Sequence, residues 1–284
     1  MTATVITESA RGEKPTYLRR LEAALDQDID AAAQSVRAAI CGDCHVHSDW
    51  SDGGSSILEM ARAARDLGHQ YMALTDHSRN LIVARGLSAD RLREQLRLTR
   101  ALNEELAPFR ILTGIEVDIT EDGELDQEDE LLAELDVVVA SIHSKLRSPR
   151  DVMTERMVRA IANPNTDILG HCTGRIVVGR GRPESEFDAE LVFAACRRAG
   201  VAVEINSRPE RLDPPKRWLR LAHELGCRFS IDTDAHAPGQ LEWQIIGCER
   251  AALCGIPPQS IVNTMGTESL LAWTRTHGQR HPSR

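Results

Sequence analysis

Two histidines one residue apart, His45 and His47, lie in the stretch GDCHVHSDWSDGG. In a β-strand, residues i and i+2 point to the same face, so these two imidazoles converge on one point. Asp52 follows shortly after them, in front of two glycines. An HxH pair alone is a weak indication of a metal site, because histidines at a strand end can also bond to the backbone. The rest of the chain must decide between these two interpretations.

Histidines and carboxylates also recur at the ends of other apolar runs, such as YMALTDH, RILTGIE and VVVASIH. The full set is His45, His47, Asp52, His77, Glu116, His143, His171, Asp234 and His236. Six of the ten histidines belong to this set. The remaining four are His69, His223, His277 and His281. These four fall in predicted helices, turns or the tail, and we expect them to be structural or solvated.

Such a concentration of imidazoles and carboxylates favours a metal centre. Ionised carboxylates that converge in one pocket repel each other and are costly to desolvate, and bound cations remove both costs. Imidazole and carboxylate oxygen suit borderline ions such as Zn²⁺ or Mn²⁺. If Glu116 bridges two ions, the nine groups would serve three ions and leave positions open for water and substrate.

The elements that must position these groups follow an alternating pattern. Strand-like runs cover residues 43–47, 71–77, 110–118, 136–144, 166–171, 201–207 and 228–236. Helical runs cover residues 56–68, 88–107, 123–135, 150–163, 187–200, 215–226, 240–255 and 267–278. Strands that alternate with helices predict an α/β fold with a parallel sheet, and their number favours a barrel. Active sites of such barrels lie at the C-terminal ends of the strands, where the polar set falls.

The residues before the first strand are predicted to be an appendage to this barrel. We expect residues 1–12 to be disordered and residues 13–40 to form a short helical extension. Within it, residues 16–27 and 28–40 read as two short helices with apolar residues at helical spacing. The barrel domain is predicted to cover residues 41–284.

Composition narrows the class of protein. The chain has 284 residues, of which 42% are hydrophobic and 27% charged, as in ordinary globular proteins. We expect no membrane span, because no apolar run is long enough, and no secretion signal. The seven cysteines are an odd number and are scattered, which favours reduced thiols in the cytoplasm. Cys41 and Cys44 form a CxxC, but its place within a strand argues against a redox or zinc-knuckle role.

The charge of the chain is negative overall and uneven along the sequence. A net charge of −9 argues against general nucleic-acid binding. Residues 117–136 contain ten acidic and no basic residues, whereas residues 145–220 contain fifteen basic and ten acidic ones. The second segment could attract phosphate locally, or could be an ordinary solvated face.

Taken together, the motifs HVHSDWSDG, ALTDHS, GIEVD, SIHS, GHCTGR and DTDAH resemble those of the PHP (polymerase and histidinol phosphatase) family. The resemblance runs from about Gly42 to the last helices. It is most similar to the PHP module of bacterial family X DNA polymerases and to related stand-alone PHP proteins. It implies a distorted seven-stranded (β/α)7 barrel, similar to a TIM barrel, with a trinuclear metal centre.

The resemblance also implies how the ions are shared. One ion would be held by His45, His47, Glu116 and Asp234, a second by Glu116, His143 and His171, and a third by Asp52, His77 and His236. The expected ions are three divalent cations, Zn²⁺ or Mn²⁺, with Fe²⁺ as a further candidate. Cys172 departs from the family pattern, in which proline often follows the histidine. Its thiol could coordinate metal, although a packed side chain is the simpler interpretation.

This centre leads to a first hypothesis of a metal-dependent phosphoesterase that hydrolyses a phosphomonoester or a nucleic-acid 3′ end. Glu116, His77 and Asp234 are the expected catalytic residues, and Arg175 and Arg208 are expected to bind the substrate phosphate. A second hypothesis is a histidinol phosphatase, which the acidic net charge fits somewhat better. A third is a metal-stabilised, non-catalytic binding module of a DNA-repair assembly, with the N-terminal helices as a remnant of a DNA-contacting extension. The complete ligand set weighs against the third hypothesis.

Overall fold

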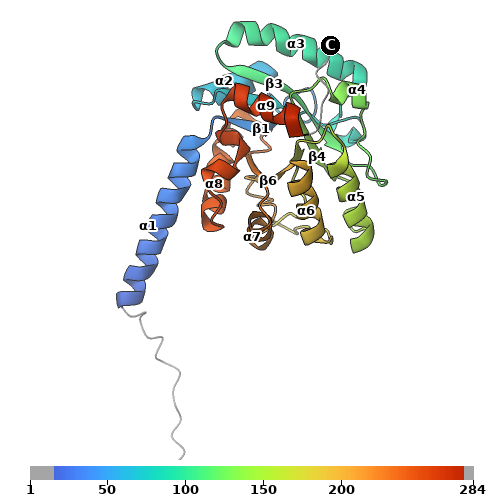
Figure 1. The fold of residues 1–284 in the computed structure, drawn as a ribbon. Helices are drawn as coiled ribbons and strands as arrows, with labels where there is room; N and C mark the ends of the chain where they lie inside the picture. The colour runs from blue at the N-terminus through green and yellow to red at the C-terminus, as the bar shows by residue number, and fades with distance from the viewer. Residues whose placement is uncertain (1–15, 278–284) are drawn as a thin grey trace, which may run out of the picture.

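The computed structural model describes residues 16–277, with side chains described over residues 28–275. At its centre is one sheet of seven parallel strands that follow one another in sequence order (Figure 1). The strands are β1 Gly42–Val46, β2 Tyr71–Leu74, β3 Arg110–Asp118, β4 Val137–Ser141, β5 Ile168–Leu169, β6 Ala202–Asn206 and β7 Phe229–Asp232. Each predicted strand is therefore present, and most are shorter than the apolar runs that predicted them.

The first and last strands meet and nearly close the sheet into a barrel. The backbone N–H of His47 donates to the carbonyl oxygen of Ala235 at 2.8 Å. The backbone N–H of Cys44 donates to the Asp232 carboxylate at 2.9 Å. These contacts take the place of a continuous ladder between β1 and β7, which is the distortion expected of the seven-stranded barrel. The predicted fold class is confirmed.

The residues of β4 show how the barrel is filled. Val138 and Ala140 belong to the apolar cluster that includes residues of the outer helices, such as Met157. Val137 and Val139 belong to a different cluster, which includes Leu270. Because successive residues of a strand point to opposite faces, the second cluster lies inside the barrel.

The last helix covers the end of the barrel that is opposite the polar residues. Helix α9, Thr267–His277, contributes Leu270 to the inner cluster. The segment before it contacts the first residue of β2, because the Tyr71 hydroxyl donates to the carbonyl oxygens of Asn263 and Met265. One end of the barrel is thus covered by apolar side chains, which leaves the C-terminal ends of the strands for a site.

The helices stand around the outside of the sheet, and α5 to α8 lie next to one another in Figure 1. Their bounds are α2 Ile57–Asp66, α3 Ala89–Leu106, α4 Asp129–Leu132, α5 Arg150–Ala162, α6 Ala189–Ala199, α7 Lys216–Glu224 and α8 Gln244–Leu253. Short 3₁₀ helices are η1 Ile82–Ala84, η2 Pro238–Trp243, η3 Pro258–Ser260 and η4 Val262–Thr264. Helix α2 begins at a capping box, in which Ser56 and Glu59 satisfy each other's backbone N–H groups.

The helix predicted over residues 123–135 is reduced to α4, a correction that has a local cause. The segment before α4 folds back on β3, where Ile119 and Leu125 form an antiparallel bridge. The Asp126 carboxylate then accepts hydrogen bonds from the Ser78 hydroxyl and from the backbone N–H groups of Asn80 and Asp118. These bonds hold the acidic stretch in a turn, where its carboxylates cap backbone groups instead of a helix face.

The two short helices predicted before the barrel are instead one continuous helix, α1, Thr16–Ala39. Figure 1 shows α1 beside α8 and extending away from the barrel. Ala33 and Val36 are buried, and Ile40 just after the helix joins the main core. Residues 1–12, predicted to be disordered, lie outside the described residues. Among the helices described here, α1 included, none has the length and apolar character needed to span a membrane.

Candidate metal centre

The structure brings all nine predicted ligands together at the C-terminal ends of the strands. His45 and Glu116 lie within strands β1 and β3. The others follow strand ends or lie in the segments after them. They are His47, Asp52, His77, His143, His171, Asp234 and His236. Because the strands are parallel, their C-terminal ends meet at one rim, and side chains far apart in sequence converge there.

Glu116 occupies the middle of the cluster, and its two carboxylate oxygens face different histidines. Oε2 lies 2.7 Å from Nδ1 of His77 and 3.4 Å from Nε2 of His45. Oε1 lies 2.8 Å from Nε2 of His171 and 3.2 Å from Nε2 of His143. Its side chain is fully buried. This arrangement suits a carboxylate that bridges two cations.

A second carboxylate, Asp52, lies at the more exposed side of the cluster. Its Oδ1 is 3.3 Å from Nε2 of His236 and 3.5 Å from Nε2 of His77. Asp234 lies between this side and the interior, with Oδ1 3.4 Å from Nε2 of His47. Asp52 is 37% exposed, whereas Asp234 is 3% exposed. The cluster therefore runs from a buried end near Glu116 to a solvent-facing end at Asp52.

Three overlapping groups of these side chains have ligand atoms within 4.8 Å of one another. The groups are His45, His47 and Glu116; His77, Glu116 and His143; and His47, Asp52, His77 and His236. The group of His45, His47 and Glu116 contains three of the four ligands predicted for the first ion. The group of His47, Asp52, His77 and His236 contains all three ligands predicted for the third ion. Asp234 and His171 lie outside the three groups but at contact distance from members of them. The assignment of individual ligands to individual ions stays a prediction.

The donor atoms fit divalent cations, because several of them are buried without another partner. Within the described residues, Nε2 of His45, both ring nitrogens of His47, Nε2 of His143 and Oε2 of Glu116 accept or donate no hydrogen bond. A buried polar atom without a partner is costly, and native structures rarely leave several together. Imidazole nitrogen and carboxylate oxygen are ligands of borderline metals, so ions would satisfy these atoms.

The carboxylates are held in the charged form that binds metal. Burial raises the pKa of Glu116, but the neighbouring His77 and His143 oppose it, and the net pKa lies well below the ordinary value. For Asp234, the neighbouring His47 ring and the charge of Arg211 likewise overcome burial and hold the pKa well below its usual range. Both side chains are therefore ionised at neutral pH although they are buried.

The histidines have pKa values shifted in both directions. Burial lowers the pKa of His143, but the charge of Glu116 and a hydrogen bond to Asp118 outweigh this effect and raise the net pKa to about 9. Burial and then the charge of Arg211 lower the pKa of His171 to about 4. His171 is thus already neutral, as a metal ligand must be, whereas His143 must lose a proton to bind.

Asp234 has an unusual backbone conformation. Its φ is +53°, in the left-handed region that residues other than glycine rarely adopt. Aspartate tolerates this region better than most residues, but the conformation still costs energy. It orients the Asp234 carboxylate toward His47, and the carboxylate also accepts a hydrogen bond from the Asn206 amide at 3.2 Å.

A cavity of about 390 Å³ opens above the exposed side of the cluster. It is lined by ligands of the cluster, by the aliphatic side chains of Leu81, Ile176 and Val178, and by Arg208 and Arg211. Arg211 Nε lies 3.2 Å from Asp234 Oδ2, and Arg208 Nη1 lies 3.5 Å from Asp234 Oδ1. Two cationic side chains therefore lie at the edge of a cluster of metal-binding groups. This combination is suited to phosphate chemistry.

The comparisons with known proteins agree with this geometry. The family model described as the PHP domain matches residues 43–208, which is more than half of the chain. The chain belongs to the PHP family.

Two curated relatives show how the PHP domain is used elsewhere. The chain is 40% identical over 253 residues to the DNA polymerase/3′-5′ exonuclease PolX of Bacillus subtilis, covering 88% of this chain and 44% of that protein. It is 32% identical over 205 residues to a probable phosphatase of Thermoanaerobacter sp., covering 68% of this chain and 78% of that protein. The chain therefore spans less than half the length of the PolX protein that it matches.

A solved structure supports the PHP barrel. It is the histidinol phosphate phosphatase of Lactococcus lactis, complexed with zinc, L-histidinol and phosphate. The TM-score is 0.54 at 17% sequence identity, and the match covers 76% of this chain and 93% of that one. At this identity the likeness shows the shared fold.

Two carboxylates that contact predicted ligands, Glu204 and Asp118, were not predicted from the sequence. Glu204 in β6 accepts from Nδ1 of His45 at 2.6 Å and from the backbone N–H of His171. Asp118, at the end of β3, lies 3.1 Å from Nδ1 of His143. Such carboxylates fix which ring nitrogen faces a metal. The detectable signal was a charged residue within the buried strand AVEIN.

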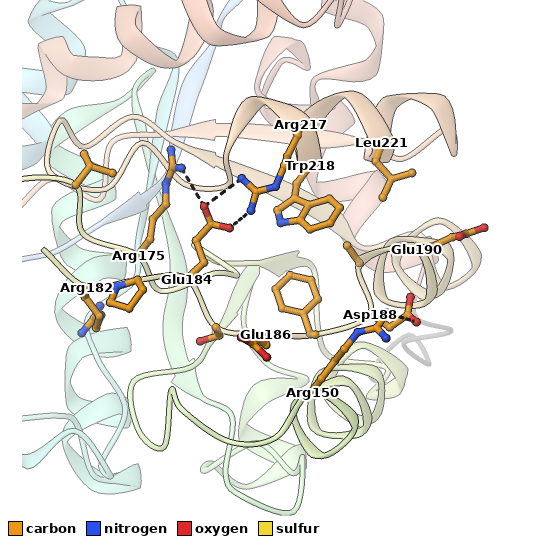
Figure 2. Close-up of a pocket in the computed structure, with 15 residues that line it drawn as sticks. Arg150, Arg175, Arg182, Glu184, Glu186, Asp188, Glu190, Arg217, Trp218 and Leu221 are labelled. Atoms are coloured by element: carbon orange, nitrogen blue, oxygen red, sulfur yellow. Dashed lines mark hydrogen bonds and ion pairs between the residues drawn. The ribbon is translucent and has the colours of Figure 1, made fainter.

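Arg211 was also missed, whereas Arg175 is not placed where the prediction requires. Arg175 Nε donates to the Arg211 carbonyl oxygen at 3.0 Å, and its Nη1 pairs with Glu184 at 3.4 Å. Figure 2 shows Arg175 beside Glu184 and Arg217 in a separate pocket of about 870 Å³. Arg175 therefore supports the segment that carries Arg211 and does not line the cavity above the cluster.

Within the described residues, the cysteines and His69 do not belong to the groups of side chains that could hold a metal ion. The seven cysteines, all in the described part of the chain, are free thiols. Cys172 is packed in the main core, in agreement with the simpler interpretation. Cys44 is buried, and Cys41 Sγ donates to the carbonyl oxygens of Ala39 and Thr264. His69 is buried, and its pKa is lowered to about 4 by that burial and by the charge of Arg37.

Proposed function

We propose that this PHP protein is a metal-dependent hydrolase that cleaves a phosphomonoester or the phosphoester at a nucleic-acid 3′ end. The observation that carries the proposal is the position of Glu116, whose two oxygens face two different sets of buried histidines. A centre of several ions requires a carboxylate that can bridge two of them, and a buried carboxylate between two sets of histidines can take this role.

The proposed centre holds three divalent ions, Zn²⁺ or Mn²⁺, with Fe²⁺ as a further candidate. The nine predicted side chains would hold them as the sequence motifs imply, with Glu116 shared between the two inner ions. Bound ions of this kind supply a Lewis acid for the phosphoryl group and activate water at neutral pH. The chain's contribution is to fix the ligands, with Glu204 and Asp118 holding His45 and His143 in their orientations.

The groups that face substrate in this proposal lie around the cavity above the cluster. Arg208 and Arg211 would bind the phosphate oxygens and neutralise the charge that develops during transfer. His77 and Asp234 line the same cavity, so either could hold or move a proton beside the reacting phosphate. Arg175 would act on these groups only through the backbone of Arg211, as a positioning residue.

The histidinol phosphatase hypothesis has one supporting observation, the fold shared with a histidinol phosphate phosphatase. The lining of the cavity supports it less well. A histidinol ligand carries a positively charged amino group, which needs a free carboxylate beside the phosphate. Among the described residues lining the cavity, Glu210 is the only carboxylate that is not a predicted ligand, and it lies 3.6 Å from Arg208.

A reconstitution experiment tests the proposed function. Protein stripped with a chelator is loaded with Zn²⁺, Mn²⁺ or Fe²⁺, its metal content is measured, and turnover is followed on p-nitrophenyl phosphate, histidinol phosphate and 3′-phosphorylated DNA. We expect two to three ions per chain and metal-dependent hydrolysis. Less than one ion per chain after loading, or no hydrolysis of any phosphoester, would exclude the proposal.

The variant Glu116→Gln tests the bridging role within the same assay. An amide cannot share a negative charge between two ions, so kcat should fall roughly a thousand-fold or more. Glu121→Gln is the matched control, because Glu121 is an exposed carboxylate that pairs with Lys145 outside the cluster. If Glu116→Gln kept its full metal content and more than a tenth of wild-type kcat, Glu116 would not be the bridge.

A further inference from the structure

A pocket of about 480 Å³ lies beside helices α7 and α8, outside the metal cluster. It is lined by Arg175, Leu212, Pro215, Lys216, Arg217, Ile246, Glu249 and Arg250. None of the nine predicted metal ligands is among these residues. Figure 1 shows α7 next to α8 on the outside of the sheet. The pocket is therefore a separate feature, and its chemistry can be considered apart from that of the metal centre.

The charge of this lining is unbalanced. Four of the side chains are cationic, and one, Glu249, is a carboxylate. Glu249 is exposed and, within the described residues, forms no ion pair with these cations. Like charges that line one pocket repel each other, and a bound anion removes this cost. The excess of positive charge is local, because the whole chain carries a net charge of −9.

Arg250 supplies a buried cation to the pocket. It is 6% exposed, and it donates to three backbone carbonyl oxygens of residues 206–214. A guanidinium has five N–H groups, so at least two of those of Arg250 have no acceptor within the described residues. Burial and then the charge of Arg175 lower its pKa to about 10, which leaves it charged at neutral pH. The nearby Asp213 carboxylate instead accepts from the Thr173 hydroxyl and backbone N–H.

Two further arginines of the lining share one carboxylate. Figure 2 shows Arg175 and Arg217 both directed at Glu184. Arg175 Nη1 lies 3.4 Å from Glu184 Oε1, and Arg217 Nη1 lies 3.3 Å from the same oxygen. Glu184 lines the pocket of Figure 2 and does not line the pocket beside α7 and α8. One carboxylate balances at most one of these two positive charges.

The first turn of α7 adds to the positive potential. Lys216 is exposed, and within the described part of the chain its ammonium group makes no ion pair. It is the first residue of α7, and Pro215 before it provides no side-chain cap for the helix. The N-terminal end of a helix carries a partial positive charge. An unpaired ammonium group and a helix end therefore lie at the same pocket as the buried guanidinium of Arg250.

These charges indicate which ligand fits. When Glu184 and Glu249 are counted against the four cations of the lining, two positive charges remain, which suits a dianion better than a single carboxylate. Guanidinium groups bind phosphate oxygens through paired N–H donors, and a lysine adds a point charge. The pocket is also larger than a phosphate, and Leu212 and Ile246 give part of it an aliphatic lining.

We propose that the pocket beside α7 and α8 is a second anion site, which binds a phosphate dianion at a place separate from the metal centre. Arg250 and Lys216 bind the phosphate oxygens, and the aliphatic side chains of Leu212 and Ile246 contact any organic part of the ligand. Inorganic phosphate and the phosphate group of an organic molecule share this chemistry. The inference does not depend on the proposed phosphoesterase function.

Isothermal titration calorimetry on metal-loaded protein tests the proposal. Phosphate and acetate are titrated at constant ionic strength into wild type and into Arg208→Gln, which changes an arginine of the cavity above the metal cluster. We expect a phosphate site that persists in Arg208→Gln and that acetate fills at least about ten-fold more weakly. Methylphosphonate and phenylphosphonate, which carry no hydrolysable ester, then distinguish the two sources. Tighter binding of phenylphosphonate indicates a ligand with an organic part, and equal binding indicates free phosphate.

Two substitutions with opposite expected effects assign the site to the pocket. Lys216→Gln removes an unpaired cation, and the affinity for phosphate should fall about ten-fold. Glu249→Gln removes the carboxylate of the lining, and the affinity should rise about three-fold. Arg198→Gln and Glu224→Gln are the controls, because they make the same changes of charge at exposed residues that do not line the pocket. Both controls should bind phosphate within about two-fold of wild type.

The outcomes separate this inference from the proposed function. If Arg208→Gln retains no phosphate site, or if acetate binds as tightly as phosphate, the second anion site does not exist as described. Equal losses in Lys216→Gln and Arg198→Gln would show that net charge and not this pocket determines binding, which would also overturn the inference. A failure of metal loading or of phosphoester hydrolysis bears on the proposed function alone, because phosphate binding in the pocket should be unchanged by it.

Discussion

At the scale of single residues, Glu204 decides which nitrogen of His45 faces the cluster. Its carboxylate lies 2.6 Å from Nδ1, so Nε2 is left to point toward Glu116. Asp118 does the same for His143. Carboxylates placed behind ligands in this way also raise the basicity of the imidazole, which strengthens its bond to a metal. The same feature makes metal binding compete with protons.

Metal binding should therefore release protons at neutral pH. The pKa of His143 is raised to about 9, so His143 is protonated at pH 7 and must lose its proton before it can bind an ion. As pH rises from 6 to 9 this competition weakens, and the apparent metal affinity should increase and then level off above pH 9. Calorimetric titration of stripped protein in two buffers of different ionisation enthalpy measures the protons released. Release of no protons at pH 7 would contradict this assignment.

The residues that were predicted and those that were missed differ in the kind of signal they leave. Eight of the nine predicted ligands could be proposed because they lie at the ends of apolar runs, where a histidine or carboxylate is out of place, and Asp52 follows in the loop after the first run. Arg211 and Arg175 lie in irregular segments, where the sequence does not fix the direction of a side chain. Gly174, with a φ of +61°, turns the chain just before Arg175, and the guanidinium then reaches the Arg211 carbonyl oxygen.

At the scale of elements, a buried arginine of α8 holds the segment that carries Arg208 and Arg211. Arg250 Nη1 donates to the carbonyl oxygens of Asn206 at 3.2 Å and Asp213 at 3.4 Å, and Nη2 donates to that of Pro214. Burial lowers the pKa of Arg250 to about 10, which still leaves it charged at neutral pH. One side chain thus satisfies three carbonyl groups of the segment between β6 and α7.

Arg250→Met should be strongly destabilising. It removes the donor for three buried acceptors, each of which costs about 1–3 kcal/mol when left unsatisfied, so the free energy of unfolding should fall by about 3–5 kcal/mol. Urea denaturation followed by circular dichroism measures this loss. Arg220→Met is the control, because Arg220 is exposed and makes a single bond to the Leu253 carbonyl oxygen. Similar losses in both variants would show that the carbonyl contacts of Arg250 contribute little.

Helices and strands were predictable from hydrophobic periodicity to different extents. The seven strands and most helices follow their apolar patterns, because burial on a regular face determines them. Helix α4 does not, since the Asp126 carboxylate accepts hydrogen bonds from the backbone N–H groups of Asn80 and Asp118, which hold this stretch in a turn against β3. The join between the two halves of α1 was also missed, because nothing in a helical period marks whether adjacent helices are continuous.

At the scale of the whole molecule, the predicted ligands come from both ends of the sheet. His45 and His47 belong to the β1 region and Asp234 and His236 to the β7 region, so bound ions would connect the strands where the barrel is closed by few hydrogen bonds. An unfolded chain cannot assemble this set. Ions therefore bind the folded state in preference and stabilise it through mass action.

Chelation should lower the melting temperature by several degrees. Ions at a hundred times their dissociation constant stabilise a folded protein by about 2.7 kcal/mol, and removing them reverses this gain. Differential scanning calorimetry with and without EDTA measures the shift. The shift should persist in His223→Gln, which changes a histidine of α7 outside the cluster, and shrink in His47→Gln. An identical melting temperature with and without EDTA would contradict a structural contribution from the ions.

The contact between β1 and β7 has a consequence for synthesis on the ribosome. Cys44 and Asp232, whose carboxylate the Cys44 backbone N–H contacts, are 188 residues apart. Predicted ligands lie close to each of these two residues in the sequence. A nascent chain that has reached only β6 presents His45, His47 and Glu116 but lacks Asp234 and His236. The centre can therefore be completed only after β7 has left the exit tunnel. Until then, the early histidines are exposed to any metal in the surrounding solution without the groups that complete their coordination.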